Sequence, residues 1–122
     1  MNKLTIEKQY LTLSQSKELQ ALGIDFGSAN FGIYNFYESL NDDEVTEIRP
    51  IDKIINDKLV TPTLSVAEML EMLPDYIRIE HYIGKWNVGD YHNSIYPHNI
   101  DKVLLRDALF EMLKWLKQNK LI

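Results

Sequence analysis

An amphipathic stripe near the end of the sequence constrains the fold more than any other feature. Within residues 101–118 large apolar side chains recur at the three- and four-residue spacing of one helical face. They are Leu104, Leu105, Ala108, Leu109, Met112, Trp115 and Leu116. The pattern predicts the longest helix of the chain, capped by Asn99 or Asp101. Asn119 is expected in the left-handed position after it, so that Leu121 folds back on the last turn. A stripe this wide must be buried, so the rest of the chain has to cover it.

Start and stop signals predict two shorter helices earlier in the chain. Ser14 can cap the first of them, and Gly23 stands where a left-handed glycine commonly ends a helix. Ser65 and Glu68 form a capping box for the second, because each side chain can bond the other's free backbone N–H. Pro74 then stops this helix, since proline cannot continue it.

Strand-type residues follow the first helix. Segment 31–37 is aromatic and β-branched, and a second strand over 45–49 can pair back on it. Segment 51–60 is ambiguous: its apolar residues suit a further short strand or hairpin, whereas Asn56 and Asp57 are typical of a turn. Residues 61–63 include a proline and are expected to break the chain.

A second pair of strands is predicted after the second helix. Residues 76–83 alternate strictly, which indicates a half-buried strand, and 86–91 would return beside it. Gly84 and Lys85 fit the two central positions of the hairpin turn. Residues 92–98 are expected to form a loop.

These elements predict one globular α+β domain over residues 1–122. Its antiparallel sheet would have about four strands packed with three helices, in the order α-β-β-α-β-β-α, with the C-terminal helix longest. The tripeptide Thr-Leu-Ser occurs at residues 12–14 and again at 63–65, which suggests a helix-strand-strand repeat over 12–60 and 63–98, closed by helix 101–118. Residues that are common at helix starts explain this recurrence of the tripeptide without a repeat.

Composition excludes several classes of function. The 122 residues carry a net charge of −5, which argues against nucleic acid as the main partner. Without cysteine there are no disulfides, thiolate catalysis or thiolate metal sites. No apolar run is long enough to span a membrane and no secretion signal is visible, so we expect a cytoplasmic protein that uses no membrane.

Two groups of polar residues suggest chemistry. The string from Leu22 to Ile33 resembles the first phosphate loop of actin-like and heat-shock-70-type ATPases, and also the first strand of RNase H-like resolvases. The resemblance implies that Asp25 would face a metal ion. An enzyme using Asp25 with His92 and His98 is therefore one hypothesis. A polar turn after a helix explains the same string, and the histidine spacing fits no established zinc pattern. We therefore expect no cofactor and no metal site, and lean against an enzyme.

The aromatic residues favour a different function. Tyr34, Phe36, Trp86 and Tyr91 fall in or beside predicted strands, and segment 31–37 is apolar or aromatic on both pleat faces. One face must pack on the helices, and the other is either covered or exposed for a protein partner. We take these four residues as candidate partner-binding residues.

The frame of capping and core residues resembles a group of small uncharacterised α+β proteins from phages and mobile elements of gut bacteria. It is carried by Leu13, Ser14, Leu19, Leu22, Gly23, Pro62, Ser65, Glu68, Leu70, Leu105, Ala108, Leu109, Trp115 and Leu116. The resemblance covers most of the chain and implies an origin in a phage or mobile element, but no activity. We therefore expect a non-enzymatic protein-interaction or accessory module that binds a protein partner or a second copy of itself. An acidic inhibitor that competes for a basic host surface is one form of it.

Overall fold

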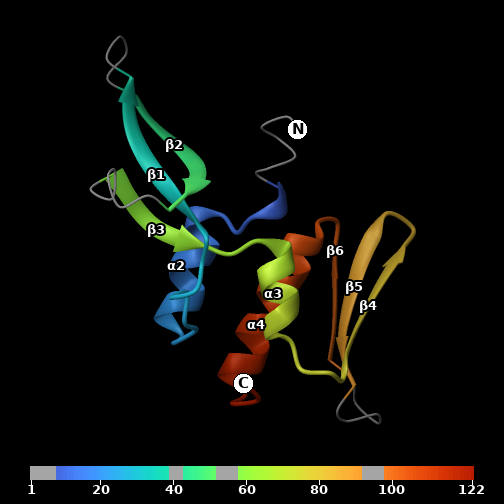
Figure 1. The fold of residues 1–122 in the computed structure, drawn as a ribbon. Coiled ribbons are helices and arrows are strands. Elements are labelled where there is room, and N and C mark those ends of the chain that lie inside the picture. The colour runs from blue at the N-terminus through green and yellow to red at the C-terminus, as the bar shows by residue number, and fades with distance from the viewer. Residues whose placement is uncertain (1–7, 39–42, 52–57, 92–97) are drawn as a thin grey trace.

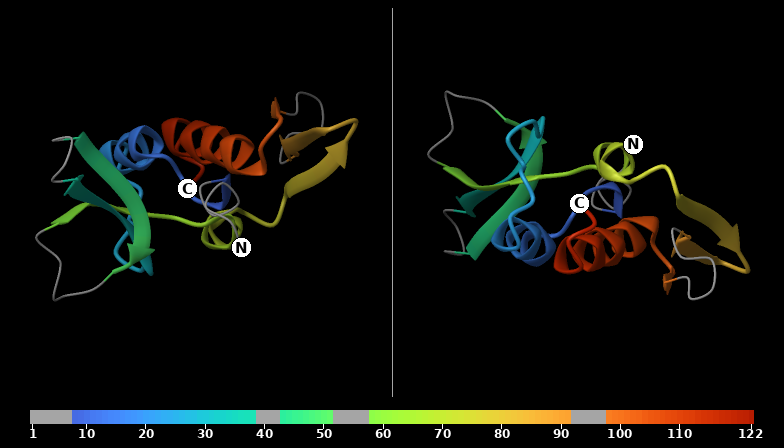
Figure 2. Two further views of the ribbon diagram at one scale, coloured as in Figure 1. Left: turned by 90° about the horizontal axis from the view of Figure 1, so that it is seen from above. Right: turned by 90° about the horizontal axis from the view of Figure 1, so that it is seen from below.

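The chain folds as two small antiparallel sheets on opposite sides of a group of helices (Figures 1 and 2). The computed structural model describes residues 8–38, 43–51, 58–91 and 98–122. In chain order the elements are α2 (Leu13–Ala21), β1 (Phe31–Glu38), β2 (Asp43–Pro50), β3 (Leu59–Thr63), α3 (Val66–Met72), β4 (Ile77–Tyr82), β5 (Lys85–Asp90), β6 (His98–Lys102) and α4 (Leu105–Gln118). The first sheet has the strand order β2-β1-β3 and the second has β4-β5-β6.

The α+β class is confirmed, but the single sheet of about four strands is wrong, because each half contributes a third strand. Strand β3 contains Pro62 and pairs antiparallel with β1, with Pro62 opposite Gly32. Proline is tolerated there because β3 is an edge strand, where one side of the backbone needs no ladder partner. Strand β6 covers residues for which the sequence predicts a loop and the start of the last helix, and it pairs along β5 from Trp86 to Asp90.

The first helix starts and ends by local hydrogen bonds. Thr12, not Ser14, is its N-cap, in a capping box with Gln15. Gly23 ends the helix as predicted, with a φ of 97°. The N–H of Ile24 donates to the carbonyl of Leu19 at 3.1 Å, which completes a Schellman motif.

The caps of the other two helices match the predictions in part. Ser65 and Glu68 form the expected capping box of α3. Helix α4 starts only at Leu105, because β6 occupies the preceding residues. At its end Lys120, with a φ of 59°, takes the left-handed position that was expected of Asn119. Leu121 does fold back onto the core, and its N–H donates to the carbonyl of Leu116.

Helix α4 supplies much of the core. Its buried residues are Ala108, Leu109, Phe110, Met112, Leu113 and Leu116. They belong to one apolar cluster with Leu11 and residues of α2, α3 and β5, and Ile77, Ile79, Trp86 and Ile100 of the second sheet pack against that cluster. The inner face of the second sheet is therefore part of the main core, and its outer face is turned away from it.

The first sheet contacts helix α2 through hydroxyl and amide groups. The hydroxyl of Ser16, fully buried, bonds the hydroxyl of Thr63 at 3.1 Å, and Thr63 donates to the carbonyl of Leu11 at 3.0 Å. One turn further on, the Gln20 amide donates to the Thr61 hydroxyl at 2.6 Å. We call these five residues the polar seam. It satisfies buried polar groups that would otherwise destabilise the fold.

Each half of the chain has a helix followed by three antiparallel strands, but the strand orders differ. In the first sheet the first strand of the half, β1, is central, whereas in the second sheet the middle strand, β5, is central. The internal repeat stays a prediction. Of the described helices, none is long and apolar enough to cross a membrane.

Candidate protein-interaction surface

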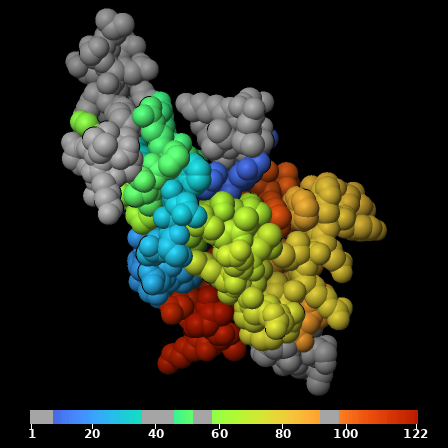
Figure 3. All heavy atoms as spheres, viewed as in Figure 1, coloured from blue at the N-terminus to red at the C-terminus, as the bar shows by residue number. Residues whose placement is uncertain are grey.

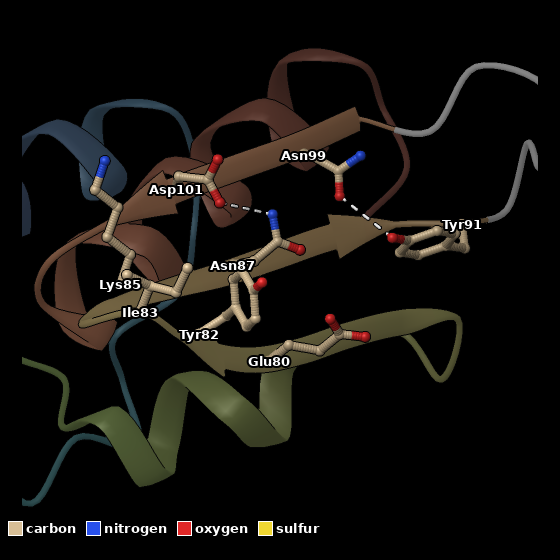
Figure 4. A pocket seen from close by; sticks show the side chains of 8 residues that line it. All are labelled: Glu80, Tyr82, Ile83, Lys85, Asn87, Tyr91, Asn99 and Asp101. Atoms are coloured by element: carbon tan, nitrogen blue, oxygen red, sulfur yellow. Dashed lines mark hydrogen bonds between the residues drawn. The ribbon is translucent and has the colours of Figure 1, made fainter.

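The outer face of the second sheet carries a groove of about 500 Å³. Figure 4 shows side chains from all three strands of that sheet standing around it. The lining residues, which we call the outer groove, are Glu80, Tyr82, Ile83, Lys85, Asn87, Tyr91, Asn99 and Asp101. Strand alternation explains its polarity, because apolar residues of each strand face α4 and the intervening polar ones face outward.

A direct hydrogen bond joins two side chains on one wall of the outer groove. The Asn87 amide donates to the Asp101 carboxylate at 2.8 Å, across the β5–β6 pair in which these two residues lie opposite each other (Figure 4). Glu80 lies opposite Asn87 on the other side. A carboxylate, an amide and a second carboxylate thus form one row across the sheet.

A tyrosine ring covers the far end of the outer groove because the strand beneath it has a glycine. A Cβ added to Gly89 would lie 2.5 Å from Cε2 of Tyr91 and 2.6 Å from Oδ1 of Asn99. The Tyr91 hydroxyl is 3.4 Å from the same Asn99 oxygen, and the Arg78 guanidinium lies 4.8 Å from the ring centroid. Gly89 is therefore required for this close approach, while the Arg78 guanidinium lies over the ring and the Tyr91 hydroxyl donates to the Asn99 amide oxygen.

The near end of the outer groove is an exposed apolar tip, formed by Tyr82, Ile83 and Val103. These side chains are 72%, 81% and 69% exposed. Tyr82 and Ile83 belong to the β4–β5 hairpin, which protrudes at one side of the molecule (Figure 3, gold). Val103 directly follows β6 at the same end of the sheet, because Lys102 pairs with Trp86. Three large apolar side chains are thus grouped at one end of a small sheet.

The hairpin turn at the tip is strained. Ile83 and Gly84 are its central residues, with φ of 50° and 73°, and Tyr82 pairs with Lys85. The predicted turn over Gly84 and Lys85 is therefore wrong by one residue. Two positive φ values define a type I′ turn, which prefers Asn-Gly because a β-branched residue is strained in the left-handed region. Ile83 occupies that position with its side chain in solvent.

The structure does not bring together the four aromatic residues predicted to bind a partner. Tyr34 is fully buried, so its ring is on no exposed surface. Trp86 is on the inner face of the second sheet, where it stacks on His81 with ring centroids 4.4 Å apart. The side chain of Phe36 lies outside the described residues. Tyr91 alone lines the outer groove.

Sequence reasoning missed the apolar tip. Strict alternation placed Ile83 on the inner face of its strand, but the one-residue shift of the hairpin puts it in the turn. A usable signal was present, since Ile-Gly stands where Asn-Gly is usual in a turn of this type.

The proposed catalytic residues lie in different surroundings. Asp25 is exposed and accepts a hydrogen bond from the N–H of Gly27 at 2.7 Å, which is an ordinary turn contact after α2. His98 stacks flat on Trp115, with centroids 4.2 Å apart, and β6 lies across α4 from α2 (Figures 1 and 2). His92 is outside the described residues. Within the described part of the chain no three His, Asp or Glu side chains cluster to hold a metal ion.

Comparison with protein-family models, with curated proteins and with solved structures found no match to this chain.

Proposed function

We propose that the chain is a non-enzymatic protein-interaction module that binds a protein partner with the apolar tip and the adjoining outer groove. The observation that supports this most directly is Ile83, a β-branched residue kept in a left-handed turn and 81% exposed. Backbone strain of this kind costs on the order of 1–2 kcal/mol. An asparagine would relieve it, so the exposed isoleucine gives no benefit to the isolated fold.

The surroundings of the tip have the chemistry of a binding site. Exposed apolar groups beside charged and amide groups match the usual arrangement of an apolar interface centre with a polar rim. Lys85, Glu80 and Asp101 supply both signs of charge next to the tip. The partner that fits is a protein with an apolar pocket flanked by groups complementary to these charges.

The origin of the protein in a phage or mobile element is part of the same proposal. The resemblance of its capping and core frame supports an accessory protein of a phage or mobile element. Its net charge of −5 is compatible with an inhibitor that competes for a basic surface. In that case binding would weaken as salt is added, because salt screens exposed charges.

Affinity capture with matched variants tests the proposal. The tagged wild-type chain, Ile83→Asn and Val60→Thr would each be exposed to lysate of the cells that encode the chain. Val60 is also an apolar residue on a surface, 38% exposed on the first sheet, and serves as the control. We expect a protein captured by the wild type and by Val60→Thr to be lost with Ile83→Asn, although Ile83→Asn folds at least as well.

The proposal is wrong if the captured proteins are the same with all three baits. It is also wrong if Val60→Thr abolishes capture while Ile83→Asn does not.

A further inference from the structure

Strand β4 is an open edge of the second sheet. Among the described residues it pairs only with β5, through six regular pairs without a bulge. Figure 2 shows β4 at the outer limit of the molecule, whereas β6 lies beside α4. Edge strands usually carry a proline, a bulge or a cover, as β3 does with Pro62, because a bare edge pairs with other chains. Within the residues that the structure describes, β4 has none of these.

The hairpin geometry shows which backbone groups point outward from β4. Tyr82 and Lys85 flank a two-residue turn, so this pair exchanges both of its hydrogen bonds. Alternate residues back along β4 therefore direct N–H and C=O groups away from β5. They are Ile77, Ile79 and His81, and they can pair with a further strand.

The side chains of β4 are complementary to a second β4 running antiparallel to the first. A two-fold pair must place one residue on the axis, because directly opposed side chains share a face of the sheet. With Arg78 or Glu80 on the axis, like charges would lie opposite each other. With Ile79 on the axis, Arg78 of each copy lies opposite Glu80 of the other copy, so two pairs of opposite charge form.

The remaining pairs in this register are also favourable. On the outer face Tyr76 would lie opposite Tyr82, and aromatic cross-strand pairs stabilise sheets. On the inner face Ile79 would meet its own copy, and this side chain is only partly covered in one chain although it packs against the core. Pairing would therefore extend the apolar core across the junction.

We propose that two copies of this chain associate through β4, antiparallel and centred on Ile79, to form one six-stranded sheet. The partner at this edge is a second copy because the charge order of β4 is self-complementary in that register. Both outer grooves would then lie on one face of the joined sheet. This pairing uses Tyr82 of the apolar tip and Glu80 of the outer groove but neither Ile83 nor Val103, so Ile83→Asn tests the proposed function without changing a residue of the pairing.

Charge reversal in solution tests the register. Sedimentation equilibrium from micromolar to millimolar chain should show a mass between one and two chains that rises with concentration. Arg78→Glu and Glu80→Arg each place like charges opposite each other at two positions, and each should raise the dissociation constant about tenfold. An equimolar mixture of the two variants should associate again, because every pair is then of opposite sign.

Controls separate this pairing from general charge effects and from misfolding. Lys85→Glu makes a matched charge change on the neighbouring strand and should leave the dissociation constant unchanged, as should Ile83→Asn at the tip. Recovery in the mixture shows that both charge variants are folded. A mass of one chain at every concentration overturns the proposal. Dimers that tolerate either single reversal, or variants that fail to recover on mixing, overturn it as well.

Discussion

The two sheets are joined to the helices by different kinds of contact. The second sheet contributes Val88, fully buried, to the apolar cluster around α4. The first sheet meets α2 through the polar seam, in which buried hydroxyls such as those of Ser16 and Thr63 bond each other. Apolar contact is tolerant of direction, whereas a buried hydroxyl needs a partner at the right distance and angle.

This difference has a consequence for function. A sheet whose inner face is fixed in the main core can carry strained or exposed groups on its other side without losing its place. The tip residue Ile83 is such a group, on the second sheet. The first sheet meets α2 through a few directional bonds, so changes to the polar seam should be less well tolerated for their size.

The largest effect is expected from shortening a side chain in the apolar attachment. Val88→Ala removes two buried methyl groups from the centre of the second sheet and should lower the free energy of unfolding by about 2–3 kcal/mol. Chemical denaturation measures this directly. The same change at Val60, 38% exposed on the first sheet, should cost far less. Equal losses at the two sites would contradict the assignment of the main core to the second sheet.

A smaller loss is expected from breaking the polar seam. Thr63→Val keeps the shape of the side chain but leaves the Ser16 hydroxyl and the Leu11 carbonyl without this partner, which should cost about 1–2 kcal/mol. Adding Ser16→Ala removes one of the stranded groups. The double variant should therefore be less destabilised than the sum of the single ones, measured by a double-mutant cycle. If the losses of the two single variants simply add, the contact between Ser16 and Thr63 contributes no coupling free energy.

The helices could be predicted from the sequence because their signals are local. The capping box of Ser65 and the stop at Gly23 depend on residues a few positions away. Strand β6 was not predicted, and β3 was only one alternative for segment 51–60 that ended before residues 61–63, because the evidence for both strands lies far away in the chain. Pro62 argued against a strand until its edge position was known, and Asp101 served as well for a helix cap as for a strand.

The candidate surface was less predictable, for a related reason. Whether an aromatic strand residue is buried depends on which helix covers it, and Tyr34 proved to be buried. The position of Ile83 depended on a single residue of hairpin register, and a one-residue slip moves side chains to the other face. Tyr91 was identified, but the Gly89 that lets its ring lie over β5 was not.

A gain in stability is expected at the tip of the second sheet. Ile83→Asn places the preferred residue in the type I′ turn and should raise the free energy of unfolding by about 1 kcal/mol. Thermal unfolding would show this as a rise in the transition temperature. Gly84, with a φ of 73°, is the control, because Gly84→Ala in the same turn should destabilise the fold. A loss of stability in Ile83→Asn would mean that the isoleucine serves the fold itself.

The smallest effect is expected where the helices of the two regions are linked by an ion pair. Lys114 on α4 lies 2.6 Å from the Glu18 carboxylate on α2, and this hydrogen bond and charge raise the pKa of Lys114. A lysine with a raised pKa stabilises the fold below the pKa of the unfolded chain, about 10.4, and loses that contribution as pH rises through the folded value. In thermal unfolding at pH 7, Glu18→Gln should therefore have a slightly lower transition temperature than the wild type. The difference should fade as the pH rises above the folded pKa of Lys114, and also in high salt. Because Glu18 is exposed and Lys114 partly so, a difference as large as that of Thr63→Val would show that this link contributes as much as the polar seam to holding the first region to the second.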